Sequence, residues 1–259
     1  MTDFPTTQFI DAPDSRPWRS GLAAVRGRFL TSRWRRTTPP SAEQPTTELS
    51  SLSPSLLQDL MRFDGPGGAR RELLEVLAAC LRHTQPLAIS VALGRQALTL
   101  IIYPQQRQAY GQLSMAELLV HDLKQLQVLQ VQPASQRPPD AGDAAGVDAQ
   151  VHSMPLGALL WGVALLGGRS TLLPELAGQA AYRLAPGINL STFEMPQALA
   201  QAIPRLRGQS RNLKEIASWP GLNAERAMRL LNALYLQSGL IVSRSHPAAT
   251  NEGWSGYSD

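Results

Sequence analysis

The sequence has a single cysteine, Cys80, among its 259 residues, so an intramolecular disulfide is excluded and a reducing compartment is expected. The four histidines are scattered, and the chain contains neither a His-x-x-x-His pair nor a Cys-x-x-Cys pair. Metal sites in proteins usually combine such closely spaced ligands. We therefore expect no metal site, and we expect Cys80, which lies in an apolar stretch, to be a core residue.

Sequence motifs of nucleophilic or acid–base catalysis are missing as well. No Gly-x-Ser-x-Gly elbow occurs. The glycine cluster at 64–68 lacks the Gly-Lys-Ser/Thr ending of a phosphate-binding loop, so we interpret it as a turn. We expect a protein that is not an enzyme and carries no cofactor. A catalytic site assembled only in space leaves no such motif and stays open as an alternative.

Long apolar runs are absent too, since no stretch reaches the roughly 18 apolar residues of a membrane-spanning helix. The first residues lack the basic-then-apolar order of a signal peptide. We therefore expect a cytoplasmic, bacterial protein. Charged residues make up only 17% of the chain, and the net charge of +4 favours anionic partners without establishing nucleic-acid binding.

The first distinctive stretch that is present is an arginine-rich segment, residues 16–36, within an arm (1–50) that we expect to be disordered. The segment contains seven arginines and no acidic residue. On a helix, its apolar residues and part of its arginines would form separate faces. The residues expected to make contacts are Trp18, Arg19, Leu22, Val25, Arg26, Phe29, Arg33 and Trp34.

Two glycines, Gly21 and Gly27, each weaken a helix in this segment by about 1 kcal/mol relative to alanine. We therefore expect the segment to fold only on contact with a second surface. An anionic membrane and the groove of a partner protein both suit an arginine face opposite an apolar face. A basic arm that makes no contacts is the alternative.

Residues 53–133 have the pattern of a small α+β domain with an antiparallel sheet. Apolar residues alternate with small or polar ones in two adjacent runs, which predicts a hairpin. Ser114 and Glu117 have the spacing of a capping box. The predicted order is α-α-β-β-α-β, with a helix that begins at Ser53–Pro54, helices at 69–83 and 115–122, and strands at 87–93, 98–103 and 126–131.

A segment rich in Pro, Gly, Ala and Asp, residues 134–152, predicts a linker or long loop between two domains. After it, residues 154–166 predict an apolar helix at the start of a second, mostly helical domain, 153–244. Residues 245–259 are polar and are expected to form a disordered tail.

Residues 213–242 predict two helices and a strand. Gly221 tolerates the positive φ of a tight turn, and Asn223 is a good N-cap for the helix that follows. The expected elements are a short helix at 213–219, a longer helix at 224–237 and a strand at 240–242.

This pattern resembles the helix-turn-helix of bacterial winged-helix regulators. In that family a small residue of the first helix is followed four positions later by the turn glycine, here Ala217 and Gly221. Residues 239–242 resemble the chain that enters the wing. The resemblance covers about 35 of the 259 residues, and two features depart from it: Pro220 precedes the glycine, and no second wing strand is evident after Arg244.

The resemblance implies that polar side chains of the second helix could enter the major groove of DNA. We expect Arg226, Arg229 and Asn232 on its solvent face. The candidate residues for contact with nucleic acid or with a partner are Arg211, Lys214, Arg226, Arg229 and Asn232. Arginines on a small helical domain that are merely solvated are the alternative.

Together these patterns favour a non-enzymatic, cytoplasmic adaptor or regulatory protein that acts through protein–protein contacts. A winged-helix, DNA-binding transcription regulator is the alternative. Peripheral contact with an anionic membrane through residues 16–36 would be compatible with either.

Overall fold

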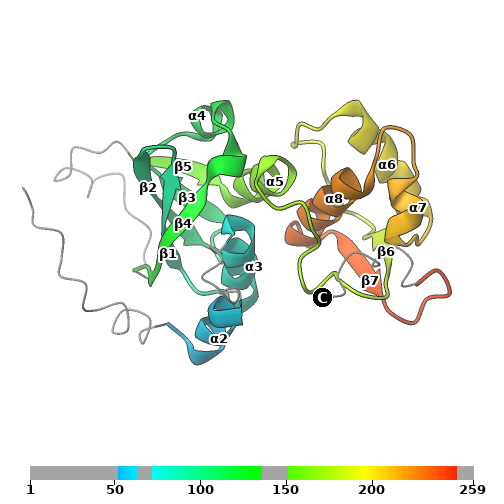
Figure 1. Ribbon diagram of the computed structural model, residues 1–259, viewed down its shortest axis with the longest axis horizontal. Helices are drawn as coiled ribbons and strands as arrows, with labels where there is room; N and C mark the ends of the chain where they lie inside the picture. Colours follow the sequence, from blue (N-terminus) through cyan, green and yellow to red (C-terminus); the bar gives the residue numbers. More distant parts are fainter. Residues whose placement is uncertain (1–51, 63–71, 136–150, 250–259) are drawn as a thin grey trace, which may run out of the picture. The chain divides into compact units, whose positions relative to one another are not determined.

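The computed structural model describes residues 52–62, 72–135 and 151–249, which all belong to one compact unit spanning residues 44–259 (Figure 1). The arm at 1–50, including every contact residue expected between Trp18 and Trp34, lies outside the described residues. So do residues 136–150 of the expected linker and residues 250–259 of the expected tail.

The first half of the described chain forms a five-stranded antiparallel sheet. Its strands are, in spatial order, β4 (Gln127–Pro133), β1 (Leu87–Leu93), β2 (Gln96–Tyr103), β3 (Gln108–Gly111) and β5 (His152–Pro155). Along β1, fully buried residues alternate with half-buried ones, so the period of two in the sequence places Leu87, Ile89 and Val91 on the core face. β2 pairs with β1 through the tight turn at Gly94, as the hairpin prediction requires.

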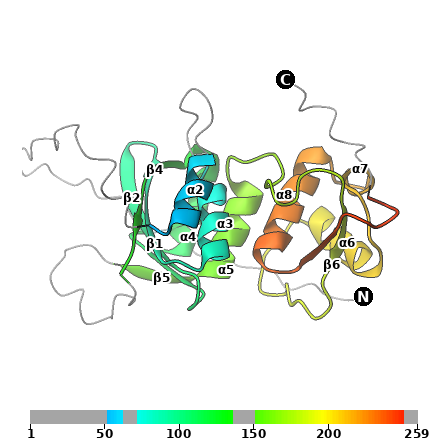
Figure 2. The same ribbon diagram turned by 90° about the horizontal axis from the view of Figure 1, so that it is seen from below.

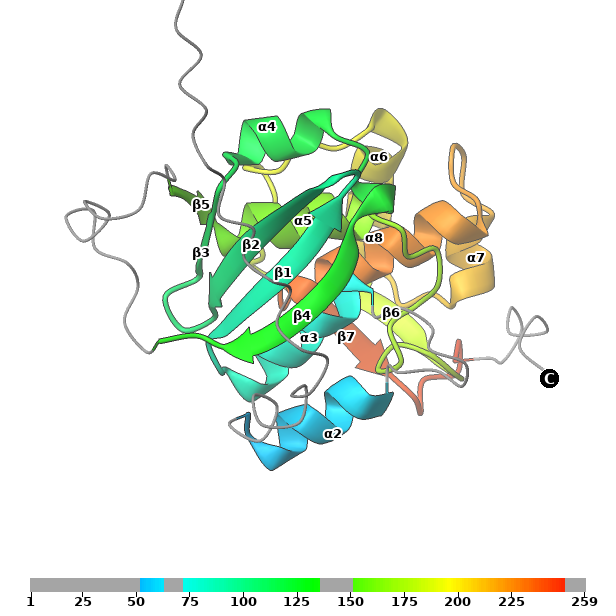
Figure 3. The same ribbon diagram turned by 60° about the vertical axis from the view of Figure 1, so that its left-hand side comes forward.

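Helices cover one face of this sheet, as Figure 3 shows by looking onto the strands with α3 and α5 behind them. The helices of this half are α2 (Pro54–Arg62), α3 (Leu73–His83), α4 (Met115–Val120), the short 3-10 helix η1 (Leu123–Gln125) and α5 (Leu156–Leu166). The capping box of α4 is formed by Ser114 and Glu117 as predicted. α5 contacts α3, β3 and β5.

The second half is built around a helix pair and a small two-stranded sheet. Its elements are β6 (Ala181–Leu184), α6 (Gln197–Gly208), α7 (Leu213–Ala217), α8 (Ala224–Leu236) and β7 (Leu240–Ser243). β7 pairs with β6, and Tyr182 of β6 also exchanges two backbone hydrogen bonds with Arg211, at 2.7 and 3.0 Å. The strand that pairs with β7 therefore comes from before the helix pair in sequence.

α5 lies between the sheet and α8, which is clearest in Figure 2. Its sequence, LGALLWGVALL, is apolar on every side, and seven of its eleven residues are buried. A helix that is apolar all round is stable in water only when it is covered on all sides. One continuous core accordingly runs from Leu52 through α5 to Leu236.

The predicted α+β class is confirmed by this arrangement. The predicted strands and helices recur within a few residues of their expected positions, whereas β3 and β5 were missed because each has only four residues. β5 begins the segment that we expected to open a separate domain, yet it completes the first sheet. No helix in the described part of the chain combines the length and the apolar character that a membrane crossing requires.

The turn between α7 and α8 depends on Gly221. Its φ of +76° is a conformation that residues with a side chain rarely adopt. A Cβ atom at this position would also lie 2.6 Å from the Cβ of Ala198, which is closer than a van der Waals contact. The turn glycine is therefore required by backbone conformation and by space, whatever the role of the helix pair.

Truncation of a core leucine of α8 should show that this helix is part of the common core. Leu230 is fully buried, so Leu230→Ala should lower the free energy of unfolding by about 2–5 kcal/mol. Ile241→Ala removes a side chain that is 45% exposed and should cost less than about 1 kcal/mol. Urea denaturation of both variants tests this, and equal losses would show that α8 is not packed as described.

Candidate functional site

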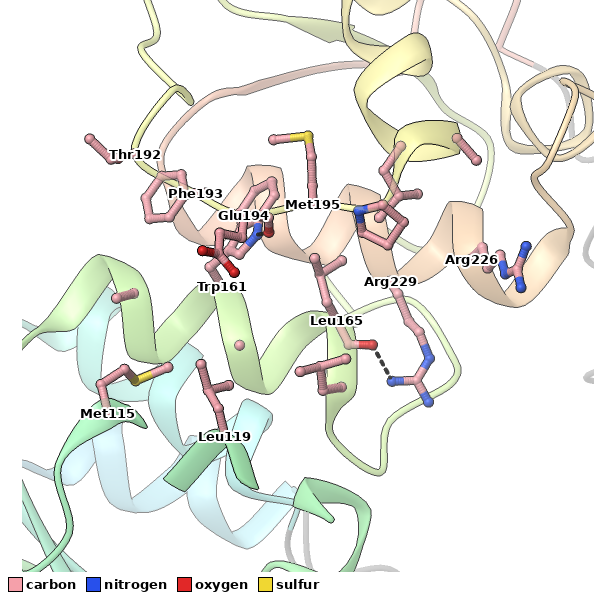
Figure 4. A pocket seen from close by; sticks show the side chains of 16 residues that line it. Met115, Leu119, Trp161, Leu165, Thr192, Phe193, Glu194, Met195, Arg226 and Arg229 are labelled. Carbon is pink, nitrogen blue, oxygen red and sulfur yellow. Dashed lines mark hydrogen bonds between the residues drawn. The ribbon is translucent and has the colours of Figure 1, made fainter. Parts of the chain in front are cut away.

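An apolar groove of about 750 Å³ lies beside α5 in the described part of the chain (Figure 4). Its walls come from four separate parts of the sequence: α4, α5, residues 192–199 and the first half of α8. The apolar side chains that line it include Met115, Leu119, Trp161, Leu165, Phe193 and Met195.

One wall of the groove is fixed by the contact of Trp161 with residues 193–194. The Trp161 and Phe193 rings are stacked, with centroids 4.9 Å apart and planes inclined by 16°. The Trp161 Nε1–H donates to the backbone carbonyl of Glu194 at 3.1 Å, so the indole also satisfies its only polar group. These two contacts hold a loop without regular secondary structure against α5.

The opposite wall is formed where α4 approaches α5 at Gly162. A Cβ atom on Gly162 would lie 3.0 Å from the Cε atom of Met115 and 3.3 Å from a Cδ atom of Leu119. The missing side chain thus allows Met115 and Leu119 to lie directly on the helix. The neighbouring apolar side chains remain open to solvent: Leu119 is 43% exposed, Leu166 is 50% exposed and Val120 is 85% exposed.

Among the residues that line the groove, one exposed side chain is acidic and one is basic. In Figure 4 the side chain of Glu194 extends from the loop toward α5, and Arg226 lies at the other end of the groove. Arg226 donates to the carbonyl oxygen of Gly221 at 2.9 Å, and the described residues supply no ion pair for Glu194. An apolar surface with sparse, separated charges is suited to binding, because it supplies contact area and orientation.

Two of the residues expected on the solvent face of α8 are instead buried, which corrects that expectation. The Arg229 guanidinium donates to the carbonyl oxygens of Leu165 at 3.0 Å and of Gly167 at 2.7 Å, and it pairs with Glu225 at 3.0 Å. It therefore caps the C-terminal end of α5. Arg229 is 6% exposed.

Asn232 is the second corrected residue, because its side chain is fully buried. Its Oδ1 atom accepts from the backbone N–H of Leu173 at 2.9 Å, and its Nδ2 atom donates to the carbonyl oxygen of Thr171 at 2.8 Å. Both bonds hold the loop that follows α5. The amide was expected outside because the apolar stripe of α8 was assigned to one face only, whereas α5 and this loop cover a second face.

The other three candidates are at the surface but on separate elements. Lys214 on α7 and Arg226 at the start of α8 are exposed, and Arg211 is half-buried and pairs with Glu215 at 3.1 Å. Beyond its first turn α8 shows no exposed residue, so these side chains do not continue onto an exposed face of that helix. The candidates for the arm, Trp18 to Trp34, lie outside the described residues.

The structure also joins a serine, a histidine and an aspartate that the sequence did not connect. Asp59 Oδ2 lies 2.8 Å from His83 Nε2, and Ser55 Oγ lies 3.2 Å from His83 Nδ1. An ionised carboxylate only accepts, so Nε2–H donates to Asp59, whereas the donor between Ser55 Oγ and Nδ1 depends on the protonation of the ring. The order serine–histidine–aspartate is that of a catalytic triad, but the two ring nitrogens are exchanged relative to it.

The surroundings of this trio favour a structural role. None of the three residues lines the groove, and Asp59 also pairs with Arg82 at 3.4 Å and with Arg62 at 3.6 Å. The contacts of Asp59 with residues 82 and 83 tie α2 to the end of α3. No cluster of three or more metal-ligating side chains occurs within the described ranges.

Replacing Asn232 should lower the free energy of unfolding, although a polar residue on a helix such as α8 is ordinarily exposed and tolerant of replacement. Asn232→Ala leaves the backbone groups of Thr171 and Leu173 buried without these partners, so we expect a loss of about 1–3 kcal/mol in the free energy of unfolding. Arg226→Ala, in the exposed first turn of the same helix, should change the free energy of unfolding by less than about 0.5 kcal/mol. Chemical denaturation distinguishes the two, and a harmless Asn232→Ala would contradict the assignment.

The contacts of Asp59 should also make the free energy of unfolding depend on pH in the acidic range. Burial acts to raise the pKa of Asp59, but the hydrogen bond from His83 and the charges of Arg82, His83 and Arg62 outweigh it, so this pKa is lowered. A lowered folded-state pKa gives stability that is present above the unfolded value and is lost as the pH falls through the folded one. Between about pH 5 and pH 2 the free energy of unfolding should therefore fall less steeply in Asp59→Asn than in the wild type. Parallel pH profiles from denaturation curves would contradict this.

Comparison of the chain with protein-family models, with curated proteins and with solved structures finds no match. What the chain binds is therefore argued from the chemistry of its own surfaces.

Proposed function

We propose that this chain is a non-enzymatic adaptor or regulatory protein, and that the groove beside α5 binds an amphipathic segment of a partner protein. The observation that carries the proposal is the row of solvent-exposed apolar side chains along the groove, chiefly Leu119 and Leu166. Apolar surface that is gathered in one depression marks a binding site more often than the same residues scattered singly. A cytoplasmic location is part of this proposal.

A helical segment is the occupant that fits the shape and the chemistry of the groove. An amphipathic helix places apolar residues at i, i+3, i+4 and i+7 into an apolar groove and keeps its polar face in water. Fully burying one large apolar side chain contributes about 1.5–3 kcal/mol, so covering half-exposed Leu119 and Leu166 contributes part of that for each. Added to the apolar residues of the partner, this is enough for a specific but reversible complex.

The two exposed charges would set the direction in which the segment lies. Glu194 favours a lysine or arginine of the partner at its end of the groove, and Arg226 favours an acidic residue at the other end. A segment placed in the reverse direction would bring like charges together. The partner is therefore expected to carry its basic and acidic residues at opposite ends of the apolar stripe.

The burial of α8 disfavours the alternative of a DNA-binding regulator. A recognition helix enters the major groove and contacts base edges with its N-terminal residues, and on α8 only the first turn is exposed. Arg229 and Asn232, the residues best placed for such contacts by sequence, instead bond to the end of α5 and to the loop after it. Freeing them would leave buried carbonyl groups without these donors, which is costly.

The proposal is tested by selecting random-sequence peptides on immobilised full-length protein. We expect the enriched peptides to share apolar residues at helical spacing and a basic residue at one end. Leu166→Glu and Leu119→Glu should each weaken binding of these peptides by about tenfold or more, since each places a charge in the apolar contact. The measurement is fluorescence anisotropy of a labelled peptide.

Met61→Glu is the matched control, because Met61 is 61% exposed and does not line the groove. It should leave the affinity unchanged. Failure to enrich any apolar motif, or an equal loss in the Met61 variant, would rule the proposal out. Binding of a small apolar dye to the groove without any peptide would mean that the groove is a small-molecule site instead.

A further inference from the structure

The end of α6 and the strand β6 carry exposed arginines, in contrast to the apolar groove. Arg205 and Arg207 are two positions apart on α6 and contact different neighbours, Trp219 and Ile188. Arg183, Arg205 and Arg207 are exposed, and none of them is paired with a carboxylate among the described residues. The only acidic residue between positions 195 and 224 is Glu215. Its carboxylate is already engaged, because it pairs with Arg211 and completes the capping box of α7.

The three unpaired arginines are held in place by contacts that leave most of their donors open. Arg205 lies over the ring of Trp219, with its Cζ atom 5.6 Å from the ring centroid. Arg207 donates to the carbonyl oxygen of Ile188 at 2.8 Å, and Arg183 donates to the carbonyl oxygen of Arg207 at 3.3 Å. A guanidinium has five N–H donors, so one such bond leaves several for a ligand.

Stabilisation of α6 explains only part of this arrangement. Arg205 and Arg207 lie in the last turn of α6, where a positive charge offsets the partial negative charge of the helix end. Arg183 belongs to β6 and has no such role. The hollow beside Arg205 is likewise not needed to terminate a helix.

That hollow is a cleft of about 520 Å³ between α6 and α7. Trp219 and Pro204 give it an apolar wall, and Arg205 and Arg211 stand at its edge. Glu215 also lines it, but the guanidinium of Arg211 lies 3.1 Å from its carboxylate and offsets that charge. An apolar side chain could therefore enter the cleft while neighbouring carboxylates meet the arginines.

We propose that this arginine surface, defined by Arg183, Arg205 and Arg207 with the cleft at Trp219, binds an acidic segment of a partner protein. Aspartate or glutamate side chains accept from the guanidinium groups, where bidentate pairing is geometrically favourable. An apolar residue within the segment packs on Trp219 and Pro204. This proposal rests on the proposed protein-binding function, because its occupant is also a segment of a partner protein. The binding surface is separate from the groove.

A nucleic-acid backbone fits this surface less well than an acidic segment does. Each phosphate contact releases a counterion and adds affinity, and a strongly salt-dependent DNA-binding protein makes, for example, about 6–10 of them. Three unpaired arginines supply about half of the smaller number. Beyond its exposed first turn, the helix that would follow into the major groove is packed against α5.

The test uses fluorescence anisotropy with a labelled glutamate-rich peptide that contains one central phenylalanine, and with a single-stranded and a duplex oligonucleotide. We expect the peptide to bind the full-length protein at low ionic strength. Arg205→Glu with Arg207→Glu should weaken that binding by about tenfold or more. Arg205→Gln with Arg207→Gln should weaken it less, and it guards against misfolding caused by negative charge at the end of α6.

The charge-matched control is Arg95→Glu with Lys124→Glu, two exposed positions outside this surface. It should keep most of the affinity, whereas an equal loss would show attraction to net charge alone and overturn the proposal. Tighter binding of either oligonucleotide than of the peptide, or no binding of the peptide at low salt, would overturn it as well. Leu166→Glu should leave binding of the acidic peptide unchanged. A result that contradicts the groove proposal can therefore be told apart from one that contradicts the proposal for the arginine surface.

Discussion

The hydrogen bonds from Arg229 to the end of α5 are the interaction on which the arrangement of the two halves depends. α5 ends at Leu166, whose side chain is 50% exposed, and the last carbonyl groups of a helix have no partner within the helix itself. A donor for them must come from water or from elsewhere in the chain. Arg229 provides it at Leu165 and Gly167, and its position fixes α8 against α5.

Other buried polar side chains also connect α5 and the loop after it to neighbouring helices, one to the C-terminal end of α8 and one to the start of α3. Gln237, on α8's C-terminal side, donates to the carbonyl oxygen of Gly157 at the first turn of α5. Arg169, in the loop after α5, pairs with Glu72 at the N-cap of α3 and with Glu75 in its first turn. Burial raises the pKa of Glu75 although the Arg169 guanidinium beside it acts in the opposite direction. Because a buried polar or charged group without a partner is costly, these contacts restrict how α5 can pack.

Local structure was predictable from the sequence because its causes are local. The alternation along 87–93, the capping box of Ser114 with Glu117 and the positive φ of Gly221 each depend on residues a few positions apart. The burial of Arg229 and Asn232 was not predictable in that way. Their partners lie about 60 residues earlier in the chain, at 165–173, and an arginine or asparagine on a helix is ordinarily a surface residue. The groove escaped prediction for the same reason, since its walls come from four separate segments.

A helix-turn-helix pattern specifies how two helices meet, but it does not specify which of their faces meets solvent. Here α5 covers α8, and contact surfaces therefore lie around the pair: the groove on the α5 side and the arginines on α6 and β6. The two surfaces share no lining residue. One offers apolar contact and the other offers positive charge, so a single segment suited to either would be poorly suited to the other. With both proposed occupants bound, the protein would hold two different segments at once, as the proposed adaptor role requires.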